Sequence, residues 1–261
     1  GGIRTVARVT EWMAPIMALV YIVLVLIICL ANLSDFIRVI GQIFSSAFAP
    51  EPLVGGLGGG ILAAVINGTK RGLFSNEAGQ GSSPNGAATA DVAHPVTQGL
   101  IQALGVFIDT IVICTATGLT VLLASPEVYT PGAEPEWAET TLVQHALADA
   151  LPGGWVVGFM TFVVFTFAYS SVLGYSAFAE INVSYLGGGR RGSIALRLAM
   201  TAATGLGAVV ALELAWAMAD IALALMTILN LVAVLWLSRW VFAALRDYDG
   251  QRARGVAEPA F

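Results

Sequence analysis

Residues 61–82 read ILAAVINGTKRGLFSNEAGQGS. An apolar run gives way to two basic residues and then to glycine, serine, asparagine and glutamine around one carboxylate, Glu77. Residues of these types compete with helical hydrogen bonds or tolerate non-helical backbone. At membrane depth, unwound backbone is tolerated only where protein or a water-filled cavity receives its polar groups. The stretch predicts a helix that is broken near 72–76; the alternative is a cytoplasmic loop between two helices.

The composition around this stretch is that of a membrane protein. Of the 261 residues, 57% are hydrophobic and only 11% are charged, whereas about a quarter of a soluble domain is charged. The net charge of −5 and the absence of a basic patch exclude a nucleic-acid partner. The sequence has no Walker loop, so an ATPase is not indicated.

Long apolar segments predict an all-α membrane protein with a single transmembrane domain. A membrane-crossing helix needs about 20 mostly apolar residues. We predict six crossings, which occupy 13–32, 53–92, 97–125, 151–180, 194–212 and 214–246.

The distribution of Lys and Arg predicts the orientation of these spans. Basic residues precede the first span, separate the fourth from the fifth and follow the last, whereas the connection 127–149 contains none. Because Lys and Arg collect in cytoplasmic loops, this connection is expected outside and the C-terminus in the cytoplasm. The first and third spans then both run outward. The glycine-rich segment 53–92 must therefore return inward through the membrane.

Two long motifs and two shorter ones carry a family resemblance. They are KRGLFSNEAGQGS at 70–82, HPVTQGLIQALGVFIDTIVICTAT at 94–117, VLGYSAFAE at 172–180 and LELAWAMADI at 212–221. In this order they resemble the alanine or glycine:cation symporter family, the sodium:alanine symporters.

The resemblance implies a LeuT-type fold of the amino acid/polyamine/organocation superfamily. The six spans would be core helices 5 to 10 of that fold, and core helices 1 to 4 would belong to a part of the protein before Gly1. The resemblance also implies symport of alanine and glycine with sodium ions across a prokaryotic plasma membrane by alternating access. The partners would then be the amino acid, membrane lipid and the missing helices. Sodium would be the coupling ion, with no organic cofactor.

The same resemblance implies a substrate site at the break. Phe74 would form an aromatic lid over the amino acid, and Ser171 and Tyr175 would approach the amino acid from the fourth span. We expect the carbonyl groups near Arg71 and Gly72, at the end of the first half-helix, to accept the substrate ammonium. The alternative for Phe74 is plain packing in the core.

Asp109 lies at the centre of the third span, where an unpaired charge costs about 2.5–3.5 kcal/mol. Such an acid normally faces a partner or a cavity. We expect the partner of Asp109 to be a sodium ion, Arg71 or Lys70; the alternative is a hydrogen-bonding role away from lipid. If the partner is a sodium ion, Asp109 would bind that ion together with residues of the break at 72–76.

The resemblance also implies two sodium sites lined by oxygen-bearing side chains. Ser75 and Asn76 at the break would bind one ion together with Asp109, since hard cations take oxygen ligands. Ser170 and Ser171 would line a second site, as the resemblance implies. The alternatives are that Asn76 caps the second half-helix and that the serine hydroxyls bond back to carbonyls of their own helix.

Arg71 and Asp220 form a possible gate, because Asp220 falls near the outer end of the last span. Other functions remain open at this stage: a proton-coupled transporter of another small solute, or a channel. An enzyme is not expected, since Ser75 and Glu77 have no histidine at membrane depth to act as a base.

Overall fold

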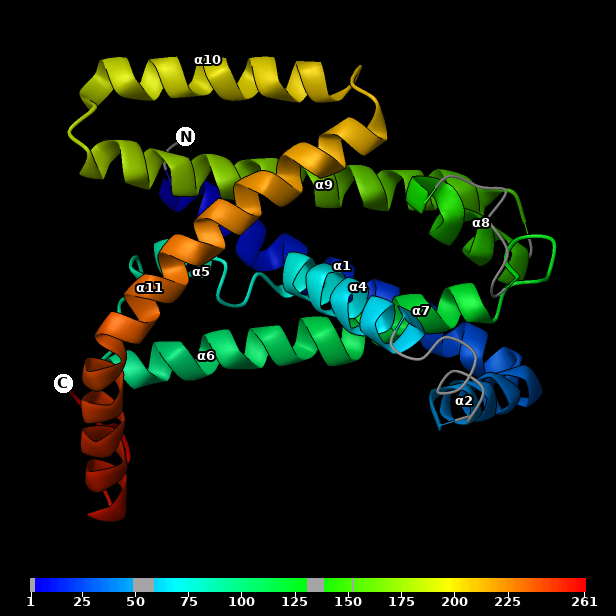
Figure 1. The fold of residues 1–261 in the computed structure, drawn as a ribbon, viewed down its shortest axis with the longest axis horizontal. Coiled ribbons are helices and arrows are strands. Elements are labelled where there is room, and N and C mark those ends of the chain that lie inside the picture. The colour runs from blue at the N-terminus through cyan, green and yellow to red at the C-terminus, as the bar shows by residue number, and fades with distance from the viewer. Residues whose placement is uncertain (1–2, 49–58, 131–138, 152) are drawn as a thin grey trace. The chain divides into compact units, whose positions relative to one another are not determined.

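A computed structural model describes residues 3–48, 59–130, 139–151 and 153–261 of the chain. Within these ranges helix is the only regular secondary structure (Figure 1). The start of the predicted 53–92 span and part of the 127–149 connection lie outside the described residues. The chain divides into two compact units, one of 1–71 and 108–174, the other of 72–107 and 175–261.

The helices follow one another as α1 (Ile3–Ala31), α2 (Leu33–Phe48), α4 (Gly59–Asn76), α5 (Ser83–Ala87), α6 (Pro95–Phe107), the π-helix η1 (Ile108–Ile113), α7 (Cys114–Leu122), α8 (Glu139–Ala150), α9 (Trp155–Tyr185), α10 (Gly189–Gly207) and α11 (Leu212–Ala253). Three stretches of helix are long and apolar enough to cross a membrane: 95–122, 155–185 and 212–253. The bent pair α1–α2 makes a fourth if it is one span. These counts cover the described ranges only, and the six crossings remain a prediction.

The first unit is held by apolar packing between α1, α7, α8 and α9. The fully buried side chains of Ile28 and Leu147 lie in its core together with Val156. A side-chain hydrogen bond joins α1 to α7, from the Tyr21 hydroxyl to Thr117 Oγ1 at 2.9 Å. Since membrane helices gain little from excluding water, such hydrogen bonds and close packing hold them together.

The helix α2 was not expected from the sequence, because its polar residues interrupt any apolar run. It leaves α1 at a bend of 100°. Asp35 and Arg38 form an ion pair at 3.0 Å on its surface, beside apolar side chains such as Ile37. A helix with one polar and one apolar face of this kind is typical of the membrane interface.

The third predicted span contains an irregularity. Between α6 and α7 the chain forms one π-helical segment, η1, with Asp109 in its first turn. Single π-helical turns inside α-helices occur frequently at functional sites. The Asp109 side chain is partly exposed.

In the second unit α6 begins beside the end of α11. Pro95 suits the first helical position, and the backbone N–H of Val96 donates to Nδ1 of the buried His94 at 3.1 Å. Asp247 of α11 faces the other ring nitrogen at 3.4 Å. Phe261 packs edge-on against the same ring and donates its N–H to the Ala93 carbonyl. His94 lies in the bend just before α6 and is buried at this end of the unit.

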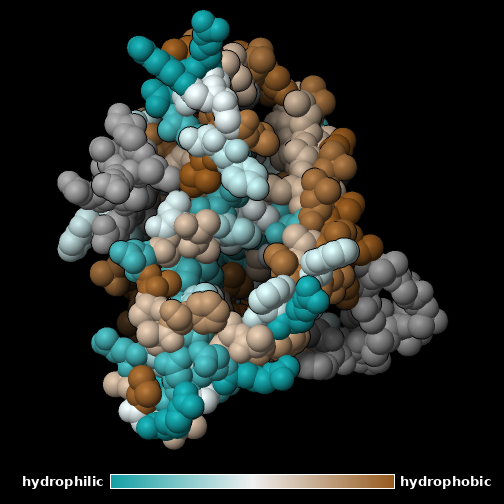
Figure 2. All heavy atoms as spheres, turned by 90° about the vertical axis from the view of Figure 1, so that its left-hand side faces the viewer, coloured by the Kyte–Doolittle hydropathy of each residue, from teal (hydrophilic) through white to brown (hydrophobic). Residues whose placement is uncertain are grey.

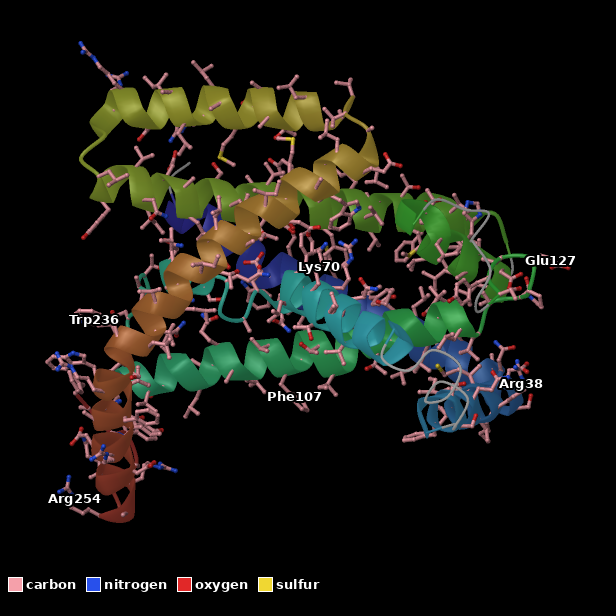
Figure 3. All side chains as sticks on the ribbon, viewed as in Figure 1. Arg38, Lys70, Phe107, Glu127, Trp236 and Arg254 are labelled. Atoms are coloured by element: carbon pink, nitrogen blue, oxygen red, sulfur yellow. The ribbon has the colours of Figure 1, made fainter. Side chains whose placement is uncertain are left out.

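Large apolar side chains cover α11 and α6 on the outside. Phe107 and Trp236 point outward (Figure 3) and are 56% and 76% exposed, as expected of side chains that face lipid. In Figure 2 hydrophilic side chains gather where α11 ends, below a largely hydrophobic stretch. This pattern fits an integral membrane protein.

Candidate functional site

The helix α4 stops at Asn76, and the chain is not helical again until Ser83. Its last helical hydrogen bond runs from the Glu77 N–H to the Leu73 carbonyl at 2.8 Å. Glu77 itself has φ of 53°, a conformation that is uncommon for any residue other than glycine and marks functional or strained sites. The loop in Figure 1 that joins α4 to α5 is this unwound segment, residues 77–82.

The position of the helix end corrects one detail of the substrate prediction. Arg71 and Gly72 lie inside α4, one turn before its end. Their carbonyl groups are therefore not the ones that end the half-helix, because a single glycine does not interrupt helical hydrogen bonding. The carbonyl end of α4 is formed by Phe74, Ser75 and Asn76.

Asn76 closes the helix locally. Its Oδ1 accepts the backbone N–H of Ala78 at 2.9 Å, which is an Asx turn. The side chain therefore ends the first half-helix rather than capping the second. The second half-helix, α5, has only 5 residues.

The carboxylate of Glu77 joins three parts of the second unit. One oxygen accepts the hydroxyl of Ser82, at the far end of the unwound segment, and the other accepts the hydroxyl of Tyr175 on α9. Ser82 is buried. Hydrogen bonds to an ionised acceptor are roughly twice as strong as neutral ones, so this carboxylate holds both ends of the segment against α9.

Asparagine side chains secure the rest of the segment. Asn85 donates to the carbonyls of Gly81 and Ser82, each at 3.2 Å. Asn182 on α9 donates to Asn85 Oδ1 at 2.9 Å. From α11, Asn230 donates to the Gly79 carbonyl at 2.8 Å.

Two aromatic side chains border the segment. Phe74, on the last turn of α4, meets Trp216 of α11 edge-on with ring centroids 4.9 Å apart. Phe74 is about one-third exposed, so part of its ring remains accessible. Tyr175, predicted beside the substrate, lies in the same unit and bonds Glu77.

Gln80 adds a buried polar atom to the segment. The residue is 6% exposed, and its side-chain oxygen has no hydrogen-bond partner among the described residues. Buried polar atoms are almost always paired in native proteins, so each exception needs an explanation. An oxygen of this kind is suited to a cation or an ammonium group.

The remaining predicted residues lie in separate places. Ser170 donates its hydroxyl to the Phe167 carbonyl at 2.8 Å, the back-bonded alternative, and Ser171 is exposed one residue later on α9. These serines and Asp109 belong to the first unit, whereas Asn76 belongs to the second. The joint cation site therefore stays a prediction.

The two residues of the predicted gate also belong to different units. Arg71 ends the first unit's share of α4, and Asp220 lies on α11 in the second unit. Each is described within its own unit, and their pairing stays a prediction.

Sequence reasoning missed the residues that hold the segment: Glu77 as a central acceptor, Ser82, Asn182 and Asn230. A signal was present for Asn230, which is a polar residue inside the uncharged run 221–238. Polar residues within a membrane helix are commonly functional.

Comparison with known proteins decides the family. The model of the sodium:alanine symporter family matches residues 1–261. The chain belongs to the sodium:alanine symporter family. This confirms the resemblance carried by the four motifs. It also places the chain among transporters and not among enzymes, as the sequence predicted.

Three relatives illustrate the range of the family. The amino-acid carrier protein AlsT of Bacillus subtilis is 38% identical over all of this chain and 54% of its own length. The sodium/proton-dependent alanine carrier protein of Bacillus sp. PS3 is 37% identical over all of this chain and 60% of its own length. The sodium/alanine symporter AgcS of Methanococcus maripaludis is 37% identical over 95% of this chain and 53% of its own length. The chain thus spans about half the length of the relatives it matches.

Proposed function

We propose that the transporter containing this chain carries alanine and glycine into the cell together with sodium ions, by alternating access. One relative is named a sodium/alanine symporter, and another is named a sodium/proton-dependent alanine carrier protein. The chain belongs to the same family. The observation that carries the proposal is the break after Asn76, where a carboxylate and several backbone polar groups are collected in one apolar unit.

The proposed substrate contacts follow from the two ends of the break. The carbonyl end of α4 carries the negative end of the helix dipole and suits the substrate ammonium. Phe74 and Tyr175 are the walls that limit the size of the side chain, and Ser171 approaches the substrate from α9. Discontinuous membrane helices bind substrates and ions in this way in other transporters.

Ser75 and Asn76 are proposed as oxygen ligands of a sodium ion, with Asp109 as a further ligand. Ser170 and Ser171 are proposed for a second sodium site. Gln80, with its buried unpartnered oxygen, is an additional candidate. In this account sodium is a transported partner of the amino acid, and no organic cofactor takes part.

The LeuT-type architecture remains part of the proposal. The helices α1 to α11 would supply core helices 5 to 10, with α4 and α5 as the discontinuous helix. The protein would lie in the plasma membrane of a prokaryotic cell with its C-terminus in the cytoplasm. The remaining core helices would come from the part of the protein that the longer relatives possess.

Proton coupling is the second candidate, because the relative from Bacillus sp. PS3 is named for both ions and Glu77 is a protonatable group at the break. Uptake of labelled alanine into proteoliposomes tests both. Accumulation above the external concentration, driven by a sodium gradient alone, is expected. Accumulation driven only by a proton gradient would mean that protons, and not sodium ions, are the coupling ions. Equilibration of alanine without accumulation would point to a channel.

A further inference from the structure

Asn230 is an amide in the middle of an apolar helix. It lies on α11 within the uncharged run 221–238. Burying an amide without a hydrogen bond costs about 1–3 kcal/mol on mutational scales, so a partner is expected. The partner is the Gly79 carbonyl, 151 residues earlier in the chain, at 2.8 Å from Asn230 Nδ2.

A second contact joins the same two elements. Gly81 has φ of +103°, and a Cβ built on it would lie 3.2 Å from Asn230 Cβ and 3.2 Å from Met226 Cγ. Met226 and Asn230 are four residues apart and so lie on one face of α11. This face therefore packs directly against the backbone of the unwound segment.

The segment needs such support. Glu77, Gly79 and Gly81 all have positive φ. Glycine adopts this conformation readily, but in Glu77 it costs of order 1–3 kcal/mol and persists only where tertiary contacts fix it. The Glu77 carboxylate and Asn85 hold the two ends of the segment. The Asn230 amide contacts its middle, at the Gly79 carbonyl.

We propose that Asn230 is a positioning residue, which sets the conformation of residues 77–82 and thereby the affinity of the break for the transported amino acid. The inference rests on the proposed function, since it names what controls that site. It assigns to α11 a role in substrate affinity that needs no contact between Asn230 and the substrate.

The test compares Asn230→Asp with Asn230→Gln in the full-length transporter, reconstituted in proteoliposomes. The aspartate keeps the size but replaces the donor by an acceptor that faces a carbonyl. The glutamine keeps the donor. We expect Asn230→Asp to raise the alanine concentration for half-maximal uptake roughly tenfold, as loss of one hydrogen bond implies, and Asn230→Gln to recover part of that loss. Gly81→Ala would place a Cβ 3.2 Å from Asn230 Cβ and strain a residue with φ of +103°, so it should raise the half-saturating alanine concentration as well.

Ser238→Ala is the matched control on α11, because the Ser238 hydroxyl only bonds back to Leu235 at 2.8 Å. A purely structural role would reduce the amount of folded transporter, and so the maximal rate, without changing the half-saturating concentration; that result overturns the proposal. An unchanged half-saturating concentration in Asn230→Asp also overturns it. If the unmodified transporter does not accumulate alanine, the proposed function fails instead. Hydrogen exchange of residues 77–82, expected to quicken in Asn230→Asp but not in Ser238→Ala, then decides whether Asn230 holds the segment.

Discussion

The backbone conformation of one residue, Glu77, sets the course of the chain at the candidate site. Its positive φ turns the chain out of α4, and its carboxylate accepts hydroxyl groups from Ser82 and Tyr175. A residue in this conformation costs of order 1–3 kcal/mol unless its surroundings fix it. The two hydroxyl donors supply that support, so the backbone turn and the side-chain bonds depend on each other.

The first prediction concerns this carboxylate. Replacing Glu77 by Gln removes the charge and one acceptor, so we expect sodium-driven alanine uptake to fall at least about tenfold. Tyr175→Phe, which removes one of the two donors, should cause a smaller loss. Glu180→Gln is the control, since Glu180 forms an ion pair with Arg197 at 2.7 Å elsewhere in the unit. Normal uptake by Glu77→Gln would show that the carboxylate is dispensable.

The second prediction concerns substrate size. Phe74 is covered on one side by Trp216, and overpacking a close-packed site costs about 1–3 kcal/mol. Phe74→Ala should therefore weaken alanine binding while relatively favouring larger amino acids. Competition of labelled alanine by alanine, serine, valine and leucine measures this. Phe242→Ala, on an exposed part of α11, is the control. A fall in affinity with unchanged selectivity would make Phe74 a structural support.

At the scale of elements, α4, α9 and α11 each supply groups that contact the break or its neighbours in the second unit. The end of α4 supplies the carbonyl groups, α9 supplies Tyr175 and Asn182, and α11 supplies Trp216 and Asn230. Each helix contributes few polar side chains, and these point to the segment 77–82 or to α5. The rest of each helix is free to carry apolar residues toward lipid.

The third prediction concerns the other half of α9. Ser171→Ala should raise the sodium concentration for half-maximal alanine uptake about threefold to tenfold, because one oxygen ligand is lost. Thr161→Ala is the control, since the Thr161 hydroxyl bonds back to the Val157 carbonyl at 2.8 Å. If the sodium dependence of Ser171→Ala equals that of the control, the second sodium site lies elsewhere.

Apolar runs in a sequence indicate long helices but not where those helices end. The predicted span 214–246 lies within α11, which continues to Ala253, because charged residues outside the membrane also favour helix. The break was expected near 72–76 from its glycine, serine and asparagine residues, and α4 ends at Asn76. Gly72 did not end the helix, since glycine only weakens it by about 1 kcal/mol.

Long-range partners could not be predicted in the same way. Nothing in the local sequence indicates that Asn230 bonds Gly79 or that Tyr175 bonds Glu77, because such pairs depend on how helices pack. The amphipathic helix α2 contains no uninterrupted apolar run, so the apolar pattern does not indicate it. Asn230 is the kind of residue that a sequence can indicate, because it is a polar residue inside such a run.

At the scale of the whole molecule, the chain corresponds to about half of its relatives. The break collects groups that attract cations: the Glu77 carboxylate, the carbonyl groups at the end of α4 and the side-chain oxygen of Gln80. None of the residues whose contacts to the segment 77–82 are given above carries a cationic side chain. An amino acid is a zwitterion, and its carboxylate needs donors such as the N–H groups at the start of a half-helix. Those donors are proposed to come from the rest of the protein.

The last prediction follows from this imbalance. Residues 1–261 alone, purified in lipid nanodiscs, should not bind alanine measurably up to millimolar concentration, whereas the full-length transporter should. The carboxylate of an alanine bound to residues 1–261 alone would have no hydrogen-bond donor from the protein. Losing a hydrogen bond to this charged group costs about 1.5–3 kcal/mol, or roughly tenfold or more in affinity. Binding of labelled alanine with and without sodium measures this, and helical circular dichroism of the same sample serves as the control for folding. Restored binding on co-expression with the preceding part of the same protein is expected. Saturable, sodium-dependent binding by the chain alone would mean that this half contains the complete amino-acid site.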